Sequence, residues 1–303
     1  MINKILSGKP IAKQLREQIQ STVQSSGIQP GMLLIQVGAD PASDYYVQNI
    51  IKTGNKLGCS VIYRILDISI DQNTLIEIIQ EGNIDPTIHG IMIQKPLPKT
   101  IDEKIINSTI SPEKDIDGIH PMNLGRIMVE DEYLLPCTPS AVLKTIEFYG
   151  IPTAGKHVVI IGRSTVVGKP LAALLIRKTY PGDATVTICH SKTHKLHLIT
   201  RTADIIVAAI GKPNFITEDM IGDNTVLIDV GINLITNPDS TDQYVGDIDY
   251  KSCFDKALAI TPVPGGIGTI TTSVLFENLL RTALVQEQNK SVDDFATVIF
   301  HDM

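Results

Sequence analysis

Residues 157–176, HVVIIGRSTVVGKPLAALLI, decide the fold of the second half of the chain. The β-branched run from Val158 to Ile161 predicts a strand that is buried on both faces. Gly162 ends this run, and from Val167 onward apolar residues recur at helical spacing. A strand, a glycine turn and a helix in this order are typical of half a dinucleotide-binding βαβ unit, where the start of the helix holds a pyrophosphate.

This pattern differs from the standard G-x-G-x-x-G fingerprint. Ser164 stands at the position of the second glycine, and Gly168 comes six positions after Gly162. A parallel α/β domain with an ordinary glycine in a strand-to-helix turn would explain the same residues. On this stretch alone, both interpretations stay open.

The composition is that of a globular protein with two domains. The chain has 303 residues, of which 43% are hydrophobic and 19% charged. Its 26 basic and 33 acidic residues give a net charge of −7, so we expect no nucleic-acid partner. The N-terminal residues lack the apolar block of a signal peptide, and no apolar run approaches the length of a membrane span. We therefore expect a cytoplasmic protein that does not contact a membrane.

The cysteines give no sign of a metal site. They are scattered along the chain without C-x-x-C spacing, at Cys59, Cys137, Cys189 and Cys253. This spacing indicates reduced thiols in the cytosol, and we expect the four side chains to be buried and unreactive.

The first half of the chain alternates helical and strand patterns. We expect helices at 11–25, 43–57 and 73–81, and strands at 32–37, 60–66 and 88–94. Such alternation predicts a parallel sheet, in which active sites lie beyond the carboxyl ends of the strands. Residues 114–126, KDIDGIHPMNLGR, are polar and rich in turn formers, so we expect them to form a loop at that edge together with 38–46 and 94–98.

A second domain is expected after the boundary at residues 136–139, PCTP, beginning with a helix at 140–149. The opening strand at 158–161 is followed by short β-branched runs that predict strands at 185–189, 205–210, 225–230 and 258–261. A glycine-rich loop at 265–268 leads into a long helix at 271–286, which we expect to pack back on the first domain. The two domains would then share one cleft.

The turn after the second strand of this domain favours NADP over NAD. NAD-binding folds usually carry Asp or Glu there to bind the ribose 2′-hydroxyl. Residues 189–193, CHSKT, contain no carboxylate, and Arg163 in the first turn adds a second cation. Arg163 and Ser191 therefore predict contacts to a 2′-phosphate. A turn that is merely solvated is the structural alternative.

Eight motifs in order point to one family. They are VGADPASDYYV (37–47), IQKPLP (93–98), PEKDIDGIHPMNLGR (112–126), GRSTVVGKP (162–170), CHSKT (189–193), DVGIN (229–233), VGDID (245–249) and TPVPGGIG (261–268). Over about residues 1–285 the chain resembles the methylenetetrahydrofolate dehydrogenase/cyclohydrolase family, FolD, of one-carbon metabolism. The resemblance implies an NADP-dependent oxidoreductase and hydrolase that binds tetrahydrofolate derivatives.

The resemblance also implies a two-domain α/β architecture. A catalytic folate domain at 1–137 would be completed by the C-terminal helix, residues 271–303, and a Rossmann-type NADP-binding domain at 138–270 would be inserted between them. Folate would lie in the cleft. Dimers through the dinucleotide domain are usual in the family, so we expect a homodimer. The scattered cysteines already lead us to expect no metal.

The folate-site residues carry over position by position. Tyr46 matches the tyrosine that packs on the pterin ring, and Asp117 matches the aspartate that binds the pterin's nitrogens. The structural alternatives are a core-covering helix residue for Tyr46 and a capping carboxylate for Asp117. Gln94 matches the glutamine that hydrogen-bonds the catalytic lysine, and Ser43 is expected to cap the helix that carries Tyr46. The loop that approaches folate is matched by Pro264, Gly265 and Gly266.

The cofactor contacts carry over in the second domain. The matching positions are Gly162, Arg163, Ser164, Gly168, Ser191 and Ile232. Asp229 and Asp247 are expected to hold loops together.

The lysine of the family is missing. It stands four residues after the tyrosine, one helical turn on, and this position is Ile50. Lys52 lies about 240° round the helix from Tyr46 and points elsewhere. Lys95, which follows Gln94 where the family has an apolar residue, is the nearest candidate to replace it. A further departure is Thr269-Ile270 in place of Pro-Met after the glycine loop.

These departures affect the two reactions of the family unequally. Hydride transfer from 5,10-methylenetetrahydrofolate chiefly needs two rings held face to face. Hydrolysis of the methenyl product needs a group that transfers protons, and isoleucine has none. We therefore expect the cyclohydrolase step to suffer most. The alternatives are a monofunctional dehydrogenase, a folate- or NADP-binding protein with a dead site, and a shikimate-type dehydrogenase.

Overall fold

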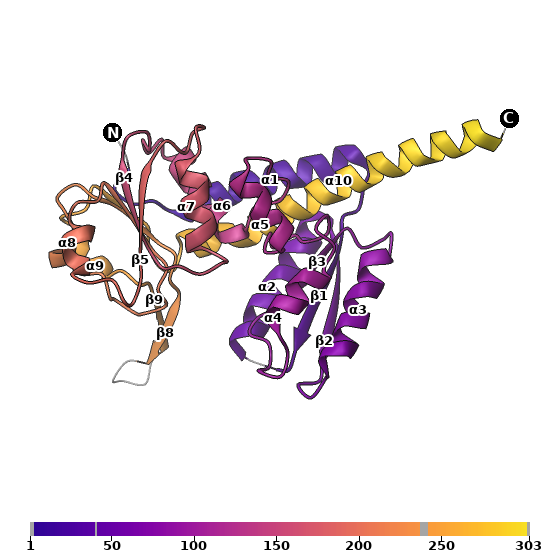
Figure 1. The fold of residues 1–303 in the computed structure, drawn as a ribbon, viewed down its shortest axis with the longest axis horizontal. Coiled ribbons are helices and arrows are strands. Elements are labelled where there is room, and N and C mark those ends of the chain that lie inside the picture. The colour runs from indigo at the N-terminus through magenta and orange to yellow at the C-terminus, as the bar shows by residue number, and fades with distance from the viewer. Residues whose placement is uncertain (1–2, 40, 237–241, 302–303) are drawn as a thin grey trace. The chain divides into compact units, whose positions relative to one another are not determined.

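The computed structural model describes residues 3–39, 41–236 and 242–301, apart from the side chains of 41–43, 45 and 290–301 (Figure 1). The chain divides into two compact units, each formed by two segments. We call Met1–Gln14 with Leu124–Val274 the five-stranded unit, and Leu15–Asn123 with Leu275–Met303 the three-stranded unit.

The three-stranded unit contains a parallel sheet of strands β1 (Gly31–Val37), β2 (Ser60–Leu66) and β3 (Gly90–Ile93). The order is β2-β1-β3, and every residue of the central strand β1 is buried. Helix α2 (Pro41–Leu57) connects β1 to β2, α3 (Gln72–Ile84) connects β2 to β3, and α4 (Glu103–Thr109) follows β3. The strands predicted for the first half of the chain are confirmed, with small shifts at their ends.

Two long helices contribute residues to both units. They are α1 (Gly8–Ser26) and α10 (Ile267–His301). Within the three-stranded unit, Asn278 Nδ2 donates to the carbonyl of Ile116 at 2.9 Å, and Gln286 Nε2 donates to the carbonyl of His89 at 3.0 Å. The C-terminal helix therefore completes the unit that begins near the N-terminus, as the fold class predicted.

The five-stranded unit contains a second parallel sheet, in the order β10-β7-β6-β4-β5. Its strands are β4 (His157–Ile161), β5 (Thr185–Cys189), β6 (Ile205–Ala208), β7 (Val226–Asp229) and β10 (Ala259–Ile260). All five were predicted. Because β4 pairs with β5 on one side and with β6 on the other, the sheet changes direction there, and ligands of such sheets bind at this switch point.

The remaining helices of the five-stranded unit are short. They are α5 (Pro121–Met128, shared with the preceding unit), α6 (Cys137–Phe148), α7 (Gly168–Ile176), α8 (Leu196–Thr200), the 3₁₀ turn η1 (Glu218–Met220) and α9 (Tyr250–Cys253). Helix α6 confirms the helix expected near the PCTP boundary, and α7 confirms the helix of the opening βα unit.

Several elements differ from the sequence-based expectation, and the short α8, η1 and α9 were not predicted. Residues 114–126 are not one loop, because a proline at the first helical position begins α5 at Pro121. Helix α4 was not predicted, and α10 begins at Ile267, inside the predicted glycine loop, and continues beyond residue 286. An antiparallel hairpin, β8 (Asn233–Thr236) with β9 (Asp242–Val245), was also missed, since neither four-residue strand, NLIT or DQYV, contains a β-branched apolar run.

The cysteines are buried, as predicted. Cys59 lies in the three-stranded unit, and the others, Cys137, Cys189 and Cys253, lie in the five-stranded unit. Burial raises the pKa of the Cys59 thiol to about 12 and that of Cys253 to about 11. Among the residues that the structure describes, no cluster of side chains could hold a metal ion, and no helix is long and apolar enough to cross a membrane.

Candidate functional site

The turn between β4 and α7 is closed by backbone contacts that only glycine permits. Gly162 has φ +138°, and a Cβ at this position would lie 2.2 Å from the carbonyl oxygen of Ala209 after β6. A Cβ at Gly168 would lie 2.0 Å from the carbonyl oxygen of Gly162. The backbones of the strand end and the helix start are thus in close contact at the switch point of the sheet. A side chain at Gly162 or Gly168 would force them apart.

Helix α7 begins without a side-chain cap among the described residues. Its N-cap residue is Val167, and the Val167 N–H donates to Ser164 Oγ at 3.0 Å. Lys169 N–H donates to the carbonyl of Ser164 at 3.1 Å, and Pro170 has no N–H, so this helix start offers an anion chiefly the N–H of Gly168 and the positive end of the helix dipole. Arg163 and Ser164 are exposed beside it. This geometry fits a pyrophosphate.

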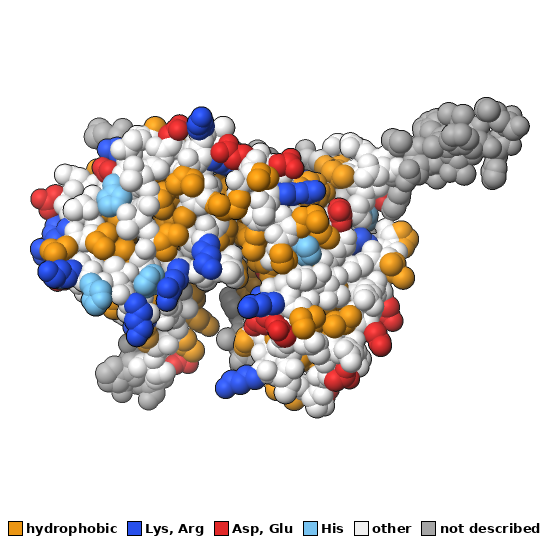
Figure 2. All heavy atoms as spheres, viewed as in Figure 1, with side chains coloured by type: hydrophobic (Ala, Val, Ile, Leu, Met, Phe, Trp, Pro, Cys, Tyr) orange, Lys and Arg blue, Asp and Glu red, His pale blue; other side chains and the backbone are white. Residues whose placement is uncertain are grey.

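The tip after β5 lies next to this turn, because Gly162 N–H donates to the carbonyl of Cys189 at 2.9 Å. The tip is a tight turn in which His190 N–H donates to Thr193 Oγ1 at 2.9 Å, leaving Ser191 exposed. Figure 2 shows Lys, Arg and His side chains gathered over this unit on the side that carries α8. The structure therefore brings the predicted phosphate contacts, Arg163 and Ser191, to one edge of the sheet.

Asp229 and Asp247 hold the neighbouring loops together, as expected. Asp229 accepts hydrogen bonds from the backbone N–H groups of Gly231, Asp247 and Ile248. Asp247 accepts from the side chain of Asn233 and from the backbone of residues 210–212. Burial raises the pKa of Asp229 to about 7. Both carboxylates are therefore engaged in hydrogen bonds that hold the loops.

The glycine loop at 264–266 also belongs to the five-stranded unit. Gly265 has φ +109°, and its carbonyl accepts a hydrogen bond from Gly8 N–H at 2.8 Å. Ile232, a predicted cofactor contact, is 58% exposed and packs close to Gly268, where a Cβ would lie 2.7 Å from its Cδ1. Pro264, Gly265, Gly266 and Ile232 thus share one unit with the glycine turn.

In the three-stranded unit, Gln94 follows β3 beside a cavity. Its backbone N–H donates to the carbonyl of Ile35 at 2.8 Å, and its Nε2 donates to the carbonyl of Lys95 at 2.7 Å. The other end of the amide, Oε1, is buried and has no hydrogen-bond partner among the described residues. An unpaired buried acceptor is costly, so this oxygen marks a place for a donor.

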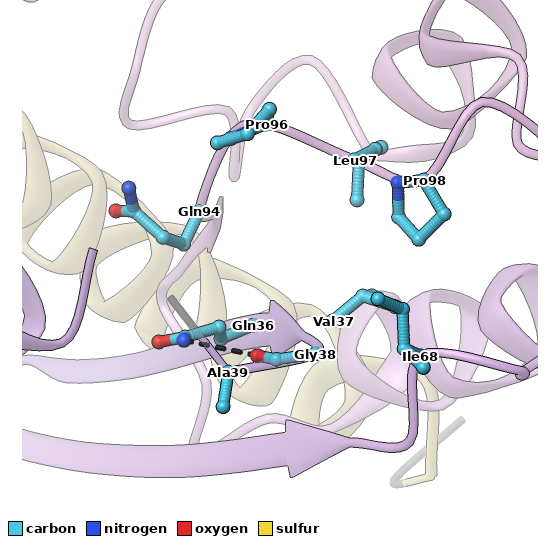
Figure 3. A pocket seen from close by; sticks show the side chains of 9 residues that line it. All are labelled: Gln36, Val37, Gly38, Ala39, Ile68, Gln94, Pro96, Leu97 and Pro98. Atoms are coloured by element: carbon cyan, nitrogen blue, oxygen red, sulfur yellow. Dashed lines mark hydrogen bonds between the residues drawn. The ribbon is translucent and has the colours of Figure 1, made fainter. Parts of the chain in front are cut away.

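The cavity has a volume of about 180 Å³ (Figure 3). Figure 3 shows the amides of Gln36 and Gln94 at one end and apolar side chains, including Leu97 and Ile68, at the other. The full lining is Gln36, Val37, Gly38, Ala39, Ile68, Gln94, Pro96, Leu97 and Pro98. An apolar slot with a few placed polar groups suits an organic ligand.

The loop that carries Asp117 is anchored beside β3. Ile91 N–H donates to the carbonyl of Lys114 at 2.7 Å, and the buried Lys114 Nζ donates to the carbonyls of Gly82 and Asp85 near the end of α3. Asp117 is partly exposed in the same unit as Gln94. Asp115 is instead buried, which raises its pKa, and its carboxylate accepts from the backbone of His120. Asp115 is therefore structural, as expected.

Helix α2 carries Tyr46, which is partly exposed, and Ile50, which is fully buried. Ser43 lies in its first turn, but the side chain is outside the described part, so the predicted cap stays a prediction. Lys52 is exposed. Lys95 Nζ pairs with Glu103 Oε2 of α4 at 3.2 Å, so in this structure Lys95 is engaged by a carboxylate.

Two family models match the chain. Residues 6–117 match the tetrahydrofolate dehydrogenase/cyclohydrolase catalytic domain, and residues 136–287 match the NAD(P)-binding domain of the same family. The chain belongs to the tetrahydrofolate dehydrogenase/cyclohydrolase family. It is 44% identical over 286 residues to the bifunctional protein FolD of Chlorobium luteolum, covering 92% of this chain and 97% of the relative. It is 43% identical over 276 residues to that of Chlamydia felis, covering 90% and 96%.

Solved structures of the tetrahydrofolate dehydrogenase/cyclohydrolase family share the fold of this chain. The bifunctional enzyme from Campylobacter jejuni aligns with a TM-score of 0.87 at 37% identity, covering 93% of this chain and 99% of its own. The Trypanosoma brucei enzyme, solved with an NADP cofactor and an inhibitor, aligns with a TM-score of 0.87 at 31% identity, covering 96% and 99%. The similarity therefore extends over both units.

A polar residue that lines the cavity was not predicted. Gln36 lines the cavity and is 2% exposed at the end of β1. The sequence held a signal for it, because Gln36 is the single polar residue in the apolar run MLLIQV. Its partners come from other elements, so the sequence alone did not identify its role.

Proposed function

We propose that this protein oxidises 5,10-methylenetetrahydrofolate with NADP⁺, and that it hydrolyses the methenyl product only weakly. The names of its relatives, bifunctional protein FolD, support both activities as the family's pair. The observation that separates the two here is the buried Ile50, which stands where the resemblance places the catalytic lysine. The proposal also includes a cytoplasmic homodimer, supported by the family resemblance.

The residues of the glycine turn fit the cofactor. Gly162 and Gly168 bring the backbone close to a ligand, and the uncapped start of α7 complements a pyrophosphate. Arg163 and Ser191 would hold the 2′-phosphate. When bound, NADP⁺ accepts the hydride. The protein's part in this step is to bind and orient the reactants, since the substrate's own nitrogen stabilises the cation that forms.

Two folate contacts, Tyr46 and Asp117, would come from the three-stranded unit. Tyr46 offers an aromatic face for the pterin ring, and Asp117 accepts two donors from it at once, which fixes the ring's orientation. We propose that Gln94 Oε1, buried and without a partner among the described residues, marks the missing lysine. In relatives with the lysine this glutamine would hold the catalytic ammonium group.

The hydrolysis of methenyltetrahydrofolate tests the proposal. Because general acid–base assistance typically contributes about 10²–10⁴-fold, we expect the wild-type protein to hydrolyse it slower by that range than relatives with the lysine. Ile50→Lys should raise hydrolysis, while Lys95→Met should leave it unchanged. The dehydrogenase rate with NADP⁺ serves as the control for folding.

Three results would contradict this assignment in different ways. Robust wild-type hydrolysis that Lys95→Met abolishes would establish Lys95 as a relocated catalytic lysine. Robust hydrolysis that survives Lys95→Met would indicate another catalytic group. A protein that binds both ligands without any hydride transfer would be a binding protein with a dead site, the second candidate that Ile50 motivates.

Asp117→Ala tests the folate contact separately. Loss of one charge-assisted pairing costs roughly 1.5–3 kcal/mol, so the KM for methylenetetrahydrofolate should rise about tenfold or more while the KM for NADP⁺ stays the same. Asp131→Ala, an exposed carboxylate of the other unit, is the matched control. An unchanged folate KM would show that Asp117 is only a loop carboxylate.

A further inference from the structure

We infer that Gln36, Asp44 and Tyr63 form a positioning triad for the first turn of α2, the helix that carries Tyr46. The inference rests on the proposed function, because it concerns how the pterin-binding tyrosine is oriented. The three residues come from β1, α2 and β2, all in the three-stranded unit.

The side-chain amide of Gln36 bonds in three directions. Its Nε2 donates to Asp44 Oδ1 at 2.8 Å and to the carbonyl of Gly38 at 3.0 Å. Its Oε1 accepts from the Tyr63 hydroxyl at 3.0 Å. Both amide N–H groups and the carbonyl are therefore used, and the amide orientation is set by the partners, since Asp44 and Gly38 offer only acceptors there.

Burial makes this arrangement specific. Gln36 is 2% exposed in a strand whose other residues are all apolar or glycine. If the buried amide lost one partner, an unsatisfied hydrogen-bonding group would destabilise the fold. The three hydrogen bonds therefore fix β1, β2 and the start of α2 relative to one another. Burial, followed by the charge of Asp44, raises the pKa of Tyr63, so its hydroxyl stays protonated as a donor at neutral pH.

The triad acts at the position where β1 passes into α2. Only residues 38–40 separate β1 from α2, and Gln36 binds both the backbone of Gly38 and the first-turn side chain of Asp44. Tyr46 follows Asp44 by two residues on the same helix. Gln36 also lines the cavity together with Gln94. The triad thus connects the cavity wall to the start of the helix that carries Tyr46.

Two neutral substitutions at one position separate the hydrogen bond from charge. Asp44→Asn keeps an acceptor for Gln36 Nε2, whereas Asp44→Leu, of similar size, has none. We expect Asp44→Leu to raise the KM for methylenetetrahydrofolate about two- to tenfold, the range for one lost hydrogen bond, with little change in kcat or in the KM for NADP⁺. Asp44→Asn should restore a KM near that of the wild type.

Tyr63→Phe removes the third bond without changing the ring, and the same rise in folate KM is expected. Its control is Tyr180→Phe, which loses a hydroxyl bonded to the carbonyls of Ile146 and Ile151 in the five-stranded unit. Thermal unfolding of every variant reports stability separately. Tyr180→Phe should lower the unfolding temperature to a similar degree but leave the folate KM unchanged.

The Tyr46→Ala variant distinguishes a failure of the triad from a failure of the proposed function. A raised folate KM in Tyr46→Ala, with Asp44→Leu and Tyr63→Phe like the wild type, would overturn the triad and leave the proposed function standing. Equal effects of Asp44→Asn and Asp44→Leu would also overturn it. An unchanged folate KM in Tyr46→Ala would refute the proposed role of Tyr46 and the triad with it.

Discussion

Helices α3 and α7 begin in opposite ways. The N-cap of α3 is Asp71, whose carboxylate accepts hydrogen bonds from the N–H groups of Asn73 and Thr74 and from the Thr74 hydroxyl. The N-cap of α7 is Val167, which makes no side-chain cap among the described residues, and the turn before it brings Gly162 and Gly168 into close backbone contact. A side-chain cap satisfies the first N–H groups of α3 within the chain, whereas the start of α7 leaves its dipole end without a carboxylate, as an anion site requires.

The largest loss of activity is expected for a substitution at Gly168, which lies in close backbone contact with Gly162. A methyl group at Gly168 would lie 2.0 Å from the carbonyl oxygen of Gly162, so Gly168→Ala must push the turn apart. We expect kcat/KM for NADP⁺ to fall about 10²-fold, the scale of a 1 Å misplacement, and stability to fall by about 1–3 kcal/mol. Steady-state kinetics and denaturant unfolding measure the two effects.

Gly125→Ala is the matched control for that change. Gly125 is exposed in α5, and no described atom lies within 4 Å of its would-be Cβ. Alanine should therefore raise stability by up to about 1 kcal/mol and leave cofactor kinetics alone. If Gly168→Ala behaved like Gly125→Ala, the close contact in the α7 turn would have no functional meaning.

An intermediate effect is expected at Arg163, the exposed cation beside the uncapped helix. Loss of a charge-assisted contact to the 2′-phosphate costs roughly 1.5–3 kcal/mol, so Arg163→Ala should raise the KM for NADP⁺ about tenfold or more. NAD⁺ lacks this phosphate and is the internal control, with a nearly constant KM. An equal rise in KM for both cofactors would mean that Arg163 supports the turn and does not bind the 2′-phosphate.

The smallest effect is expected at the capped helix. The Thr74 hydroxyl, more than any other group, lowers the pKa of Asp71 below its usual range. A carboxylate with a lowered folded-state pKa stabilises the fold above its unfolded-state pKa, and this contribution is lost as the pH falls through the folded-state value. Asp71→Ala should therefore lower the unfolding midpoint at pH 7, and the difference from the wild type should shrink below about pH 4.

Kinetics distinguish the two helix starts in the same variant. Asp71→Ala should leave the KM values for NADP⁺ and folate unchanged, because the cap of α3 serves only the architecture. A changed KM for NADP⁺ in this variant would mean that the two helix starts do not differ in function as proposed. A midpoint difference that stayed constant from pH 7 to pH 3 would show that the charge of Asp71 contributes nothing.

The parts that the sequence predicted depend on neighbours in the chain. The strands of both sheets follow from apolar runs, and the β4–α7 turn from the spacing of Gly162 and Gly168. Family membership followed from ordered motifs. Ile50 was recognised because a helical motif fixes its position relative to Tyr46.

Most of the missed parts depend on residues far apart in the chain, and the start of α5 is the exception. The role of Gln36 requires Asp44 and Tyr63 from two other elements, and no local pattern pairs them. The start of α5 at Pro121 has a local signal, a proline at the first helical position, but the polar residues around it suggested a loop. The unpaired Oε1 of Gln94 appears only when the surrounding side chains are in place.

The buried thiols can report local unfolding of the protein, because they react only when the surrounding structure opens. Cysteine reacts as the thiolate, and burial that raises the pKa of Cys59 and Cys253 suppresses that form in the native state. Because one of these cysteines lies in each unit, alkylation followed by peptide mapping would time the opening of each unit separately. Ligands that protect one thiol more than the other would then reveal which unit they bind, without any engineered label.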